Sequence, residues 1–113
     1  EGWGLPITEA FKVGLPVVAP SNSSIVDLIG ENEERGYLFA AGKTPSEWVI
    51  PYGSSWAKYP LANVDDGVST VITALTDKQK TAEKTLAANR WDNLKSWKEV
   101  GTMWVNAFNK LVS

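Results

Sequence analysis

The sequence contains no cysteine and no histidine. The lack of cysteine excludes a disulfide framework and a thiolate nucleophile. The lack of histidine excludes the Ser-His-Asp and Cys-His triads and removes a common ligand of zinc sites. There is also no apolar run near the roughly 20 residues that a membrane-spanning helix needs, and we see no secretory leader. Any catalysis must therefore rest on carboxylates, hydroxyls, lysines or backbone amides, and we expect a cytoplasmic protein.

Charge of either sign is sparse. The 113 residues include 11 basic and 13 acidic side chains, which gives a net charge of −2. The basic residues are scattered singly from Lys12 to Lys110. Because a nucleic-acid surface usually carries a clustered basic stripe, we expect no nucleic-acid partner. The hydrophobic fraction of 43% is that of a globular domain. The chain begins at Glu1 inside a glycine-rich turn, and we therefore expect a C-terminal piece of a longer protein.

The first 42 residues predict helices and strands in alternation. Pro6 suits the first position of a helix, and Gly14 suits the left-handed cap after it. Ser24, three residues before Asp27, predicts a capping box. The expected elements are a helix over 6–13, a strand over 15–19, a helix over 25–30 and a strand over 37–40. This order predicts parallel strands, and two strands are too few for an independent sheet.

The stretch over 43–64 is rich in aromatic residues, proline and glycine. A capping box is predicted over 44–47. The aromatic residues that follow have two interpretations, because they could stack on sugars or bases or could anchor a long loop to the body. We favour the second. The residues concerned are Trp48, Tyr52, Trp56 and Tyr59.

The remainder of the chain predicts three helices. In the first, Val68, Val71, Ile72 and Leu75 have the spacing of one buried face. Thr76 with Gln79 predicts the cap of a second helix that runs to about Arg90. A third helix is predicted over 92–112, with Asp92 as its cap. Its apolar stripe would either pack in the core or cross toward an absent N-terminal domain, and we favour the core. The stripe consists of Leu94, Trp97, Trp104, Phe108 and Leu111.

The residues over 1–9, Glu-Gly-Trp-Gly-Leu-Pro-Ile-Thr-Glu, are the densest candidate for a site. Their two glycines allow a ligand close to the backbone. The helix that starts at Pro6 points its first amides into this turn, which suits a phosphate. Glu1 and Glu9 flank the turn, and a carboxylate can accept hydrogen bonds from vicinal sugar hydroxyls. The pattern indicates a nucleotide-sugar site, or else a tight strand-to-helix connection beside two solvated carboxylates.

The same residues resemble the E-x7-E motif of retaining glycosyltransferases with the GT-B fold. The segment over 9–20 is similar to the helix, strand and loop that follow the motif in that family. The segment over 23–30 is similar to the next helix, and that over 35–39 to the strand after it. The segments over 64–66 and 90–92 are less similar. The resemblance implies an α/β fold over 1–113, a partial Rossmann-like domain with a short parallel sheet and a helix-rich C-terminal half. This would be part of the C-terminal, donor-binding domain.

The resemblance also implies roles for individual residues. Glu1 would lie against the transferred sugar as the catalytic residue, and Glu9 would hold the ribose hydroxyls. The backbone amides near the sugar and the diphosphate would be those of Gly2, Trp3, Gly4 and Leu5. The reaction would transfer a sugar, with retention of configuration, from a nucleotide-sugar to a saccharide or lipid acceptor. No metal and no further cofactor are expected, and any peripheral membrane contact would come from missing parts.

Two departures from the family qualify this expectation. Ser23 and Ser24 stand where the family often has glycine, and the basic pair that neutralises the leaving diphosphate lies upstream of the motif. Since such a leaving group needs charge neutralisation, we expect the 113 residues alone to be inactive. The alternatives are a non-catalytic carbohydrate-binding module that uses Trp48, Trp56 and Tyr59, an epimerase or phosphorylase of the same architecture, and a purely structural domain.

Overall fold

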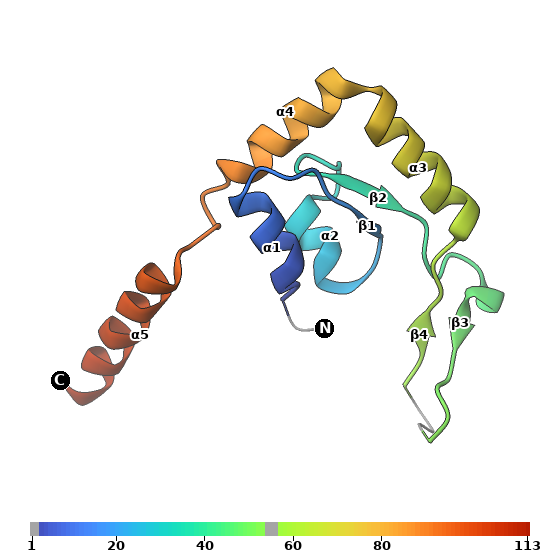
Figure 1. Ribbon diagram of the computed structural model, residues 1–113. Coiled ribbons are helices and arrows are strands. Elements are labelled where there is room, and N and C mark those ends of the chain that lie inside the picture. Colours follow the sequence, from blue (N-terminus) through green and yellow to red (C-terminus); the bar gives the residue numbers. More distant parts are fainter. Residues whose placement is uncertain (1–2, 54–56) are drawn as a thin grey trace.

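The computed structural model describes residues 3–53 and 57–113. Within these ranges the chain forms a mixed α/β structure with five α-helices, one short 3-10 helix and two small sheets (Figure 1). The helices are α1 (Leu5–Lys12), α2 (Ser23–Ile29), η1 (Pro45–Glu47), α3 (Val64–Thr76), α4 (Lys78–Asn89) and α5 (Trp97–Val112). The strands are β1 (Val18–Pro20), β2 (Tyr37–Phe39), β3 (Trp48–Val49) and β4 (Tyr59–Pro60).

Strands β1 and β2 form the predicted parallel pair, with α2 as the connection between them. Val18 lies opposite Tyr37 and Pro20 lies opposite Phe39. The first strand starts later than its apolar run predicts. The amide of Leu15 donates to the carbonyl of Ala10, so residues at the start of the run still belong to the end of α1. The sequence thus predicted the alternation and the pairing, whereas most boundaries differ by one or two residues and the start of β1 differs by three.

The core lies where α1, β1, α2 and the last turn of α4 meet. Phe11 and Ile29 are completely buried, and Ala88 of α4 is 1% exposed in the same cluster. Trp91 and Leu94, which follow α4, pack against this cluster from the outside. Burial of these apolar side chains is the main stabilising term available to the fold.

Three predicted helix caps are wrong, because the caps of the helices concerned lie one to four residues away from the predicted ones. Helix α2 follows Asn22, and Ser24 makes no cap, because its hydroxyl oxygen is buried without a hydrogen-bond partner among the described residues. Helix α4 is capped by Asp77, whose carboxylate accepts from the amide of Lys80, in place of Thr76. Aspartate is the stronger cap of the two.

Helix α5 begins at Trp97 and not at Asp92. The intervening residues form turns that keep Leu94 against the core, so a helix cannot start there. The cap is Ser96, which forms a capping box with Glu99. The capping box predicted over 44–47 is confirmed, with the amide of Thr44 donating to Oε2 of Glu47 at 2.9 Å.

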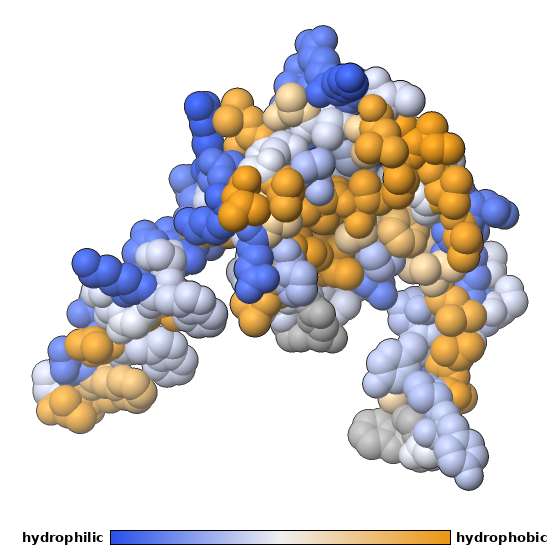
Figure 2. Space-filling view, in the orientation of Figure 1, coloured by the Kyte–Doolittle hydropathy of each residue, from blue (hydrophilic) through white to orange (hydrophobic). Residues whose placement is uncertain are grey.

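The buried face predicted for α3 is wrong. Val71, at 43% exposed, is the best covered of its four residues, and Leu75 is 70% exposed. The helix meets the sheet at Asp66, whose Oδ2 accepts the amide of Ala40 at 2.5 Å, and at Gly67, which lies beside the ring of Phe39. Its stripe residues Val68, Val71 and Ile72 line an open groove beside the sheet. The apolar stripe of α3 is consequently exposed, and Figure 2 shows apolar side chains gathered over this helix.

Helix α5 extends away from the rest of the molecule (Figure 1). Its residues are exposed apart from Val100, which is half-buried. The core packing that we favoured for the last helix is therefore wrong. Trp104 and Phe108 stack on each other along the helix, with ring centroids 5.5 Å apart. No helix in the described part of the chain has the length and apolar character that crossing a bilayer requires.

Candidate functional site

The carboxyl ends of the two parallel strands define one edge of the sheet. Helix α1 leads into β1 through the short connector over 13–17. Strand β2 is parallel to β1 and ends at the same edge. In open α/β sheets ligands bind in the crevice outside the carboxyl ends of the strands. This edge is therefore the first place to look for a site.

Gly4 shapes the start of α1. It has a φ of 84°, in the left-handed region, and provides no side chain to cap the helix. Its carbonyl accepts the amides of Ile7 at 3.0 Å and Thr8 at 3.3 Å. Pro6, in the first turn, has no amide hydrogen to satisfy. The helix start is thus built from backbone alone, an arrangement that suits an anionic group.

Glu9 lies one turn further along, on the outer side of α1. Its side chain is exposed, as is that of Leu5 four residues earlier on the same face. The opposite side is buried: Thr8 is 8% exposed and its hydroxyl donates to the carbonyl of Leu5 at 3.0 Å, while Phe11 is fixed in the core. The carboxylate of Glu9 is therefore accessible to a ligand that also reaches the first turn.

Of the predicted site residues, Trp3, Gly4 and Leu5 lie at the start of α1, whereas Glu9 lies one turn further on, in the second half of the helix, where its carbonyl accepts the amide of Val13. Trp3 is half-exposed. Glu1 and Gly2 lie outside the described residues, so the catalytic role expected of Glu1 stays a prediction.

Two serines at the end of β1 were missed as candidates. Ser23 has a φ of 49°, which non-glycine residues seldom adopt. The hydroxyl oxygen of Ser24 is buried and has no hydrogen-bond partner in the described part of the chain. A buried polar atom without a partner is uncommon. Both residues follow the carboxyl end of β1. The sequence singled them out only as a departure from the family's glycines and, for Ser24, as a helix cap.

The aromatic residues after β2 belong to a short arm formed by β3 and β4, which pair antiparallel. The indole nitrogen of Trp48 donates to the carbonyl of Gly42 at 2.7 Å. This bond anchors the arm, as we favoured for the aromatic residues. Tyr52, by contrast, is fully exposed, and Tyr59 is 54% exposed. Trp56 lies outside the described residues.

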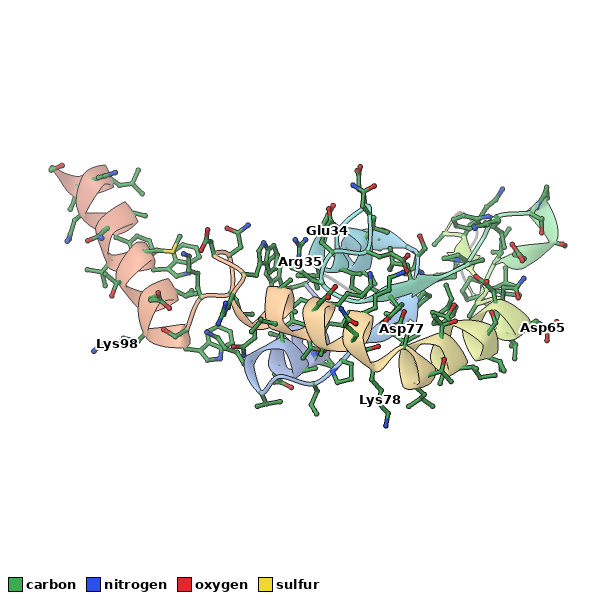
Figure 3. The ribbon with its side chains drawn as sticks, turned by 90° about the horizontal axis from the view of Figure 1, so that it is seen from above. Glu34, Arg35, Asp65, Asp77, Lys78 and Lys98 are labelled. Carbon is green, nitrogen blue, oxygen red and sulfur yellow. The ribbon has the colours of Figure 1, made fainter. Side chains whose placement is uncertain are left out.

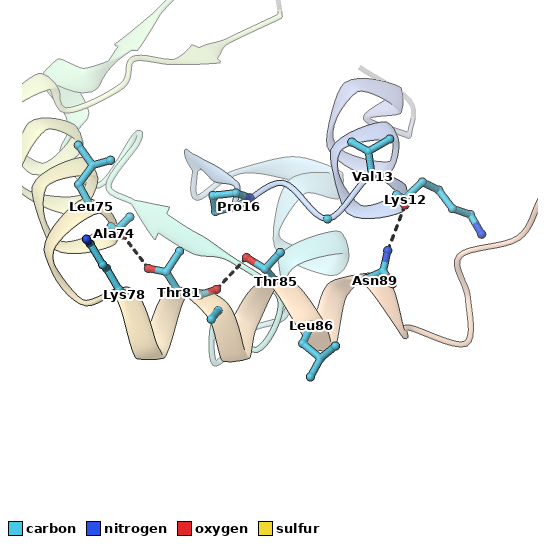
Figure 4. A pocket seen from close by; sticks show the side chains of 12 residues that line it. Lys12, Val13, Pro16, Ala74, Leu75, Lys78, Thr81, Thr85, Leu86 and Asn89 are labelled. Carbon is cyan, nitrogen blue, oxygen red and sulfur yellow. Dashed lines mark hydrogen bonds between the residues drawn. The ribbon is translucent and has the colours of Figure 1, made fainter.

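A groove of about 770 Å³ runs along α4, between the end of α3 and the end of α1 (Figure 4). Its polar groups already bond within the protein: the hydroxyl of Thr81 donates to Ala74 and that of Thr85 donates to Thr81, both at 2.7 Å. Asn89 donates to the end of α1. The groove lies at the opposite end of α1 from Gly4, so it is separate from the candidate site.

Other charged side chains lie along the length of the molecule. Figure 3 labels some of them: Glu34, Arg35, Asp65, Asp77, Lys78 and Lys98. The described residues contain no group of three or more acidic side chains that could hold a metal ion.

Lys84, although half-buried, has a structural role. Its ammonium group lies 4.8 Å from the centre of the Tyr37 ring and donates to the carbonyl of Glu33. Burial lowers its pKa below the ordinary value for lysine. The hydroxyls of Tyr37 and Thr81 are hydrogen-bonded at 2.8 Å, so these contacts together fasten α4 to β2.

Comparison of the chain with protein-family models, with curated proteins and with solved structures finds no match. Any functional conclusion must therefore come from the residues themselves and their geometry.

Proposed function

We propose that this chain is the donor-binding part of a retaining glycosyltransferase of GT-B type, working in the cytoplasm on a nucleotide-sugar. The observation that carries the proposal is the start of α1. Gly4 in a left-handed conformation opens a helix without a side-chain cap, and the exposed carboxylate of Glu9 lies one turn further on. Because a helix that leads directly into a parallel strand usually packs antiparallel to it, we infer that the start of α1 is oriented toward the carboxyl edge of the strand pair, where α/β folds bind ligands.

The spacing of these groups suits a nucleoside diphosphate. Four residues of helix separate Leu5 from Glu9, a rise of about 6 Å. That rise is comparable with the reach from a ribose hydroxyl to the phosphate on the same ribose. The first-turn amides would donate to phosphate oxygens, and the carboxylate of Glu9 would accept from the ribose hydroxyls. Glu1, just before the turn, would face the sugar that is transferred.

Ser23 adds support to the proposal. The family often has glycine here, and the backbone of Ser23 has the positive φ that glycine adopts most easily. Ser23 thus differs from the family in its side chain, but its backbone has the conformation that would explain why the family often has glycine at this position. Next to it, the hydroxyl of Ser24 is buried and has no hydrogen-bond partner among the described residues, so it would be a polar group for a ligand that displaces its cover.

The direct test is the affinity of the chain for UDP, GDP and ADP, measured by isothermal titration calorimetry. A hydrogen bond to a charged group contributes about 1.5–3 kcal/mol, so Glu9→Gln should weaken binding of the preferred nucleotide about 10- to 100-fold. Glu31→Gln is the matched control, because Glu31 is equally exposed but lies between α2 and β2. Equal affinities for the two variants, or no nucleotide binding by the unsubstituted chain, would contradict the proposal.

The carbohydrate-binding alternative rests on the exposed rings of Tyr52 and Tyr59. It requires an oligosaccharide to bind without nucleotide and Tyr59→Ala to abolish that binding. Under the transferase proposal Tyr59→Ala leaves nucleotide affinity unchanged.

A further inference from the structure

Asn89, the last residue of α4, bonds to the end of α1 across most of the sequence. Its side-chain amide nitrogen donates to the carbonyl of Phe11 at 2.9 Å and to the carbonyl of Lys12 at 3.0 Å. Figure 4 shows the second of these bonds. Both acceptors belong to the last turn of α1, where carbonyls have no partner within the helix.

These bonds restrict the rotation of α1 in a way that its apolar contacts do not. Phe11 fixes the helix in the core, and Ala88 packs in the same cluster directly before Asn89. Apolar contact is not directional, so it sets the depth of a helix more firmly than its rotation. Hydrogen bonds from one planar amide to two successive carbonyls restrict both rotation and sliding.

The other bonds at this helix end are made by the chain that continues from it. The amides of Gly14 and Leu15 donate to Phe11 and Ala10 and close the last turn. They move with α1 and cannot hold it relative to another element. Asn89 belongs to α4, which contacts Tyr37 of β2 through Lys84. It therefore connects α1 to the rest of the body.

We propose that Asn89 is a positioning residue for the donor site: it fixes the rotation of α1 and thereby the direction of the first-turn amides and of the Glu9 carboxylate. This inference rests on the proposed function. Asn89 lies at the opposite end of α1 from Gly4, so it acts through the helix and does not touch the ligand.

The test compares Asn89→Ala and the isosteric Asn89→Asp with Gln79→Ala as control. Gln79 is an exposed amide on the same helix, and its side chain donates to Glu83 within α4. The readouts are hydrogen exchange of the α1 amides and affinity for the nucleotide that the unsubstituted chain prefers. We expect Asn89→Ala to weaken affinity about 3- to 10-fold, the effect of losing one or two neutral hydrogen bonds, and to speed exchange in α1 while α3 stays unchanged.

Asn89→Asp should have the larger effect, because a carboxylate has no donor and places a negative charge beside two carbonyl oxygens. Gln79→Ala should change neither readout. If the unsubstituted chain binds a nucleotide and both Asn89 variants bind it equally well, the positioning role is refuted while the proposed function stands. If α1 exchanges no faster in Asn89→Ala, the role is refuted whatever the nucleotide result. If no nucleotide binds at all, the proposed function fails, and the donor-site role of Asn89 fails with it.

Discussion

Two phenylalanines in different surroundings provide the sharpest test of this fold. Phe11 is completely buried among Val17, Ile29 and Ala88, so Phe11→Ala removes a ring from the centre of the core. Such a substitution costs about 3–5 kcal/mol, through lost transfer free energy and the cavity that remains. Because domains are usually stable by only about 5–15 kcal/mol, the loss would be a large share of the total.

Phe108 on α5 is 57% exposed and contacts the ring of Trp104. An aromatic pair contributes about 0.5–1.5 kcal/mol when buried, so Phe108→Ala should cost less than about 1 kcal/mol. The assay is urea unfolding followed by circular dichroism, with the free energy extrapolated to water. The unsubstituted chain and both variants are compared at one protein concentration. Similar losses for the two variants would refute our account, since α5 would then take part in a core.

Three further perturbations follow from local geometry. Gly14→Ala should cost about 1–2 kcal/mol, the penalty for a left-handed residue, because φ is 71° and an added Cβ meets nothing within 4 Å. Gly42→Ala should cost more and should shift the NMR signals of Trp48, since its Cβ would lie 2.8 Å from that ring; an unchanged Trp48 would contradict the described arm. The hydrogen bond from the amide of Ser96 lowers the pKa of Glu99, so the capping box should stabilise α5 above the unfolded-state pKa and should be lost as pH falls through the lower folded-state pKa. Carbon chemical shifts of α5 followed from pH 7 into acid check this, and Glu99→Gln should remove the pH dependence.

The parts of the fold that were predictable depend on residues with few backbone options. Pro6 and Gly14 bracketed α1, which the structure places at Leu5–Lys12. Gly14 has the left-handed φ of 71° expected after a helix. The alternation of helix and strand then predicted parallel pairing correctly. Each of these inferences used steric restrictions that act within a few residues.

The caps were less predictable because several capping residue types stand side by side. Asn22, Ser23 and Ser24 are consecutive, and so are Thr76 and Asp77. Which residue caps depends on its backbone angles: Asn22 is extended, whereas Ser23 has a positive φ and already belongs to the helix. A sequence pattern contains the candidates but not the angles that choose between them.

The candidate site, like the fold, has features that the sequence predicted and features that it did not. The turn at Gly4 and the helical position of Glu9 followed from a local motif, and the structure has Gly4 directly before α1 and Glu9 within the helix. The contacts of Asn89 could not be foreseen, because they join residues 77 and 78 positions apart. Ser24 was visible in the sequence, but only the fold shows that its hydroxyl is buried without a described partner.

The apolar stripe of α3 shows why burial is harder to predict than helix formation. Periodicity identified the helix, since residues three and four apart share a face. The side that meets the sheet was decided by other groups: the carboxylate of Asp66 accepts a strand amide, and Gly67 lets the helix approach the ring of Phe39. A hydrogen bond and a missing side chain thus hold the helix at the sheet, while most of the surface of its apolar stripe stays exposed. Helix α5 illustrates the same limit, because Leu94 holds the connector to the core while the helix after it extends away. An apolar stripe predicts that a helix forms, whereas its burial depends on how neighbouring residues attach the helix to the rest of the chain.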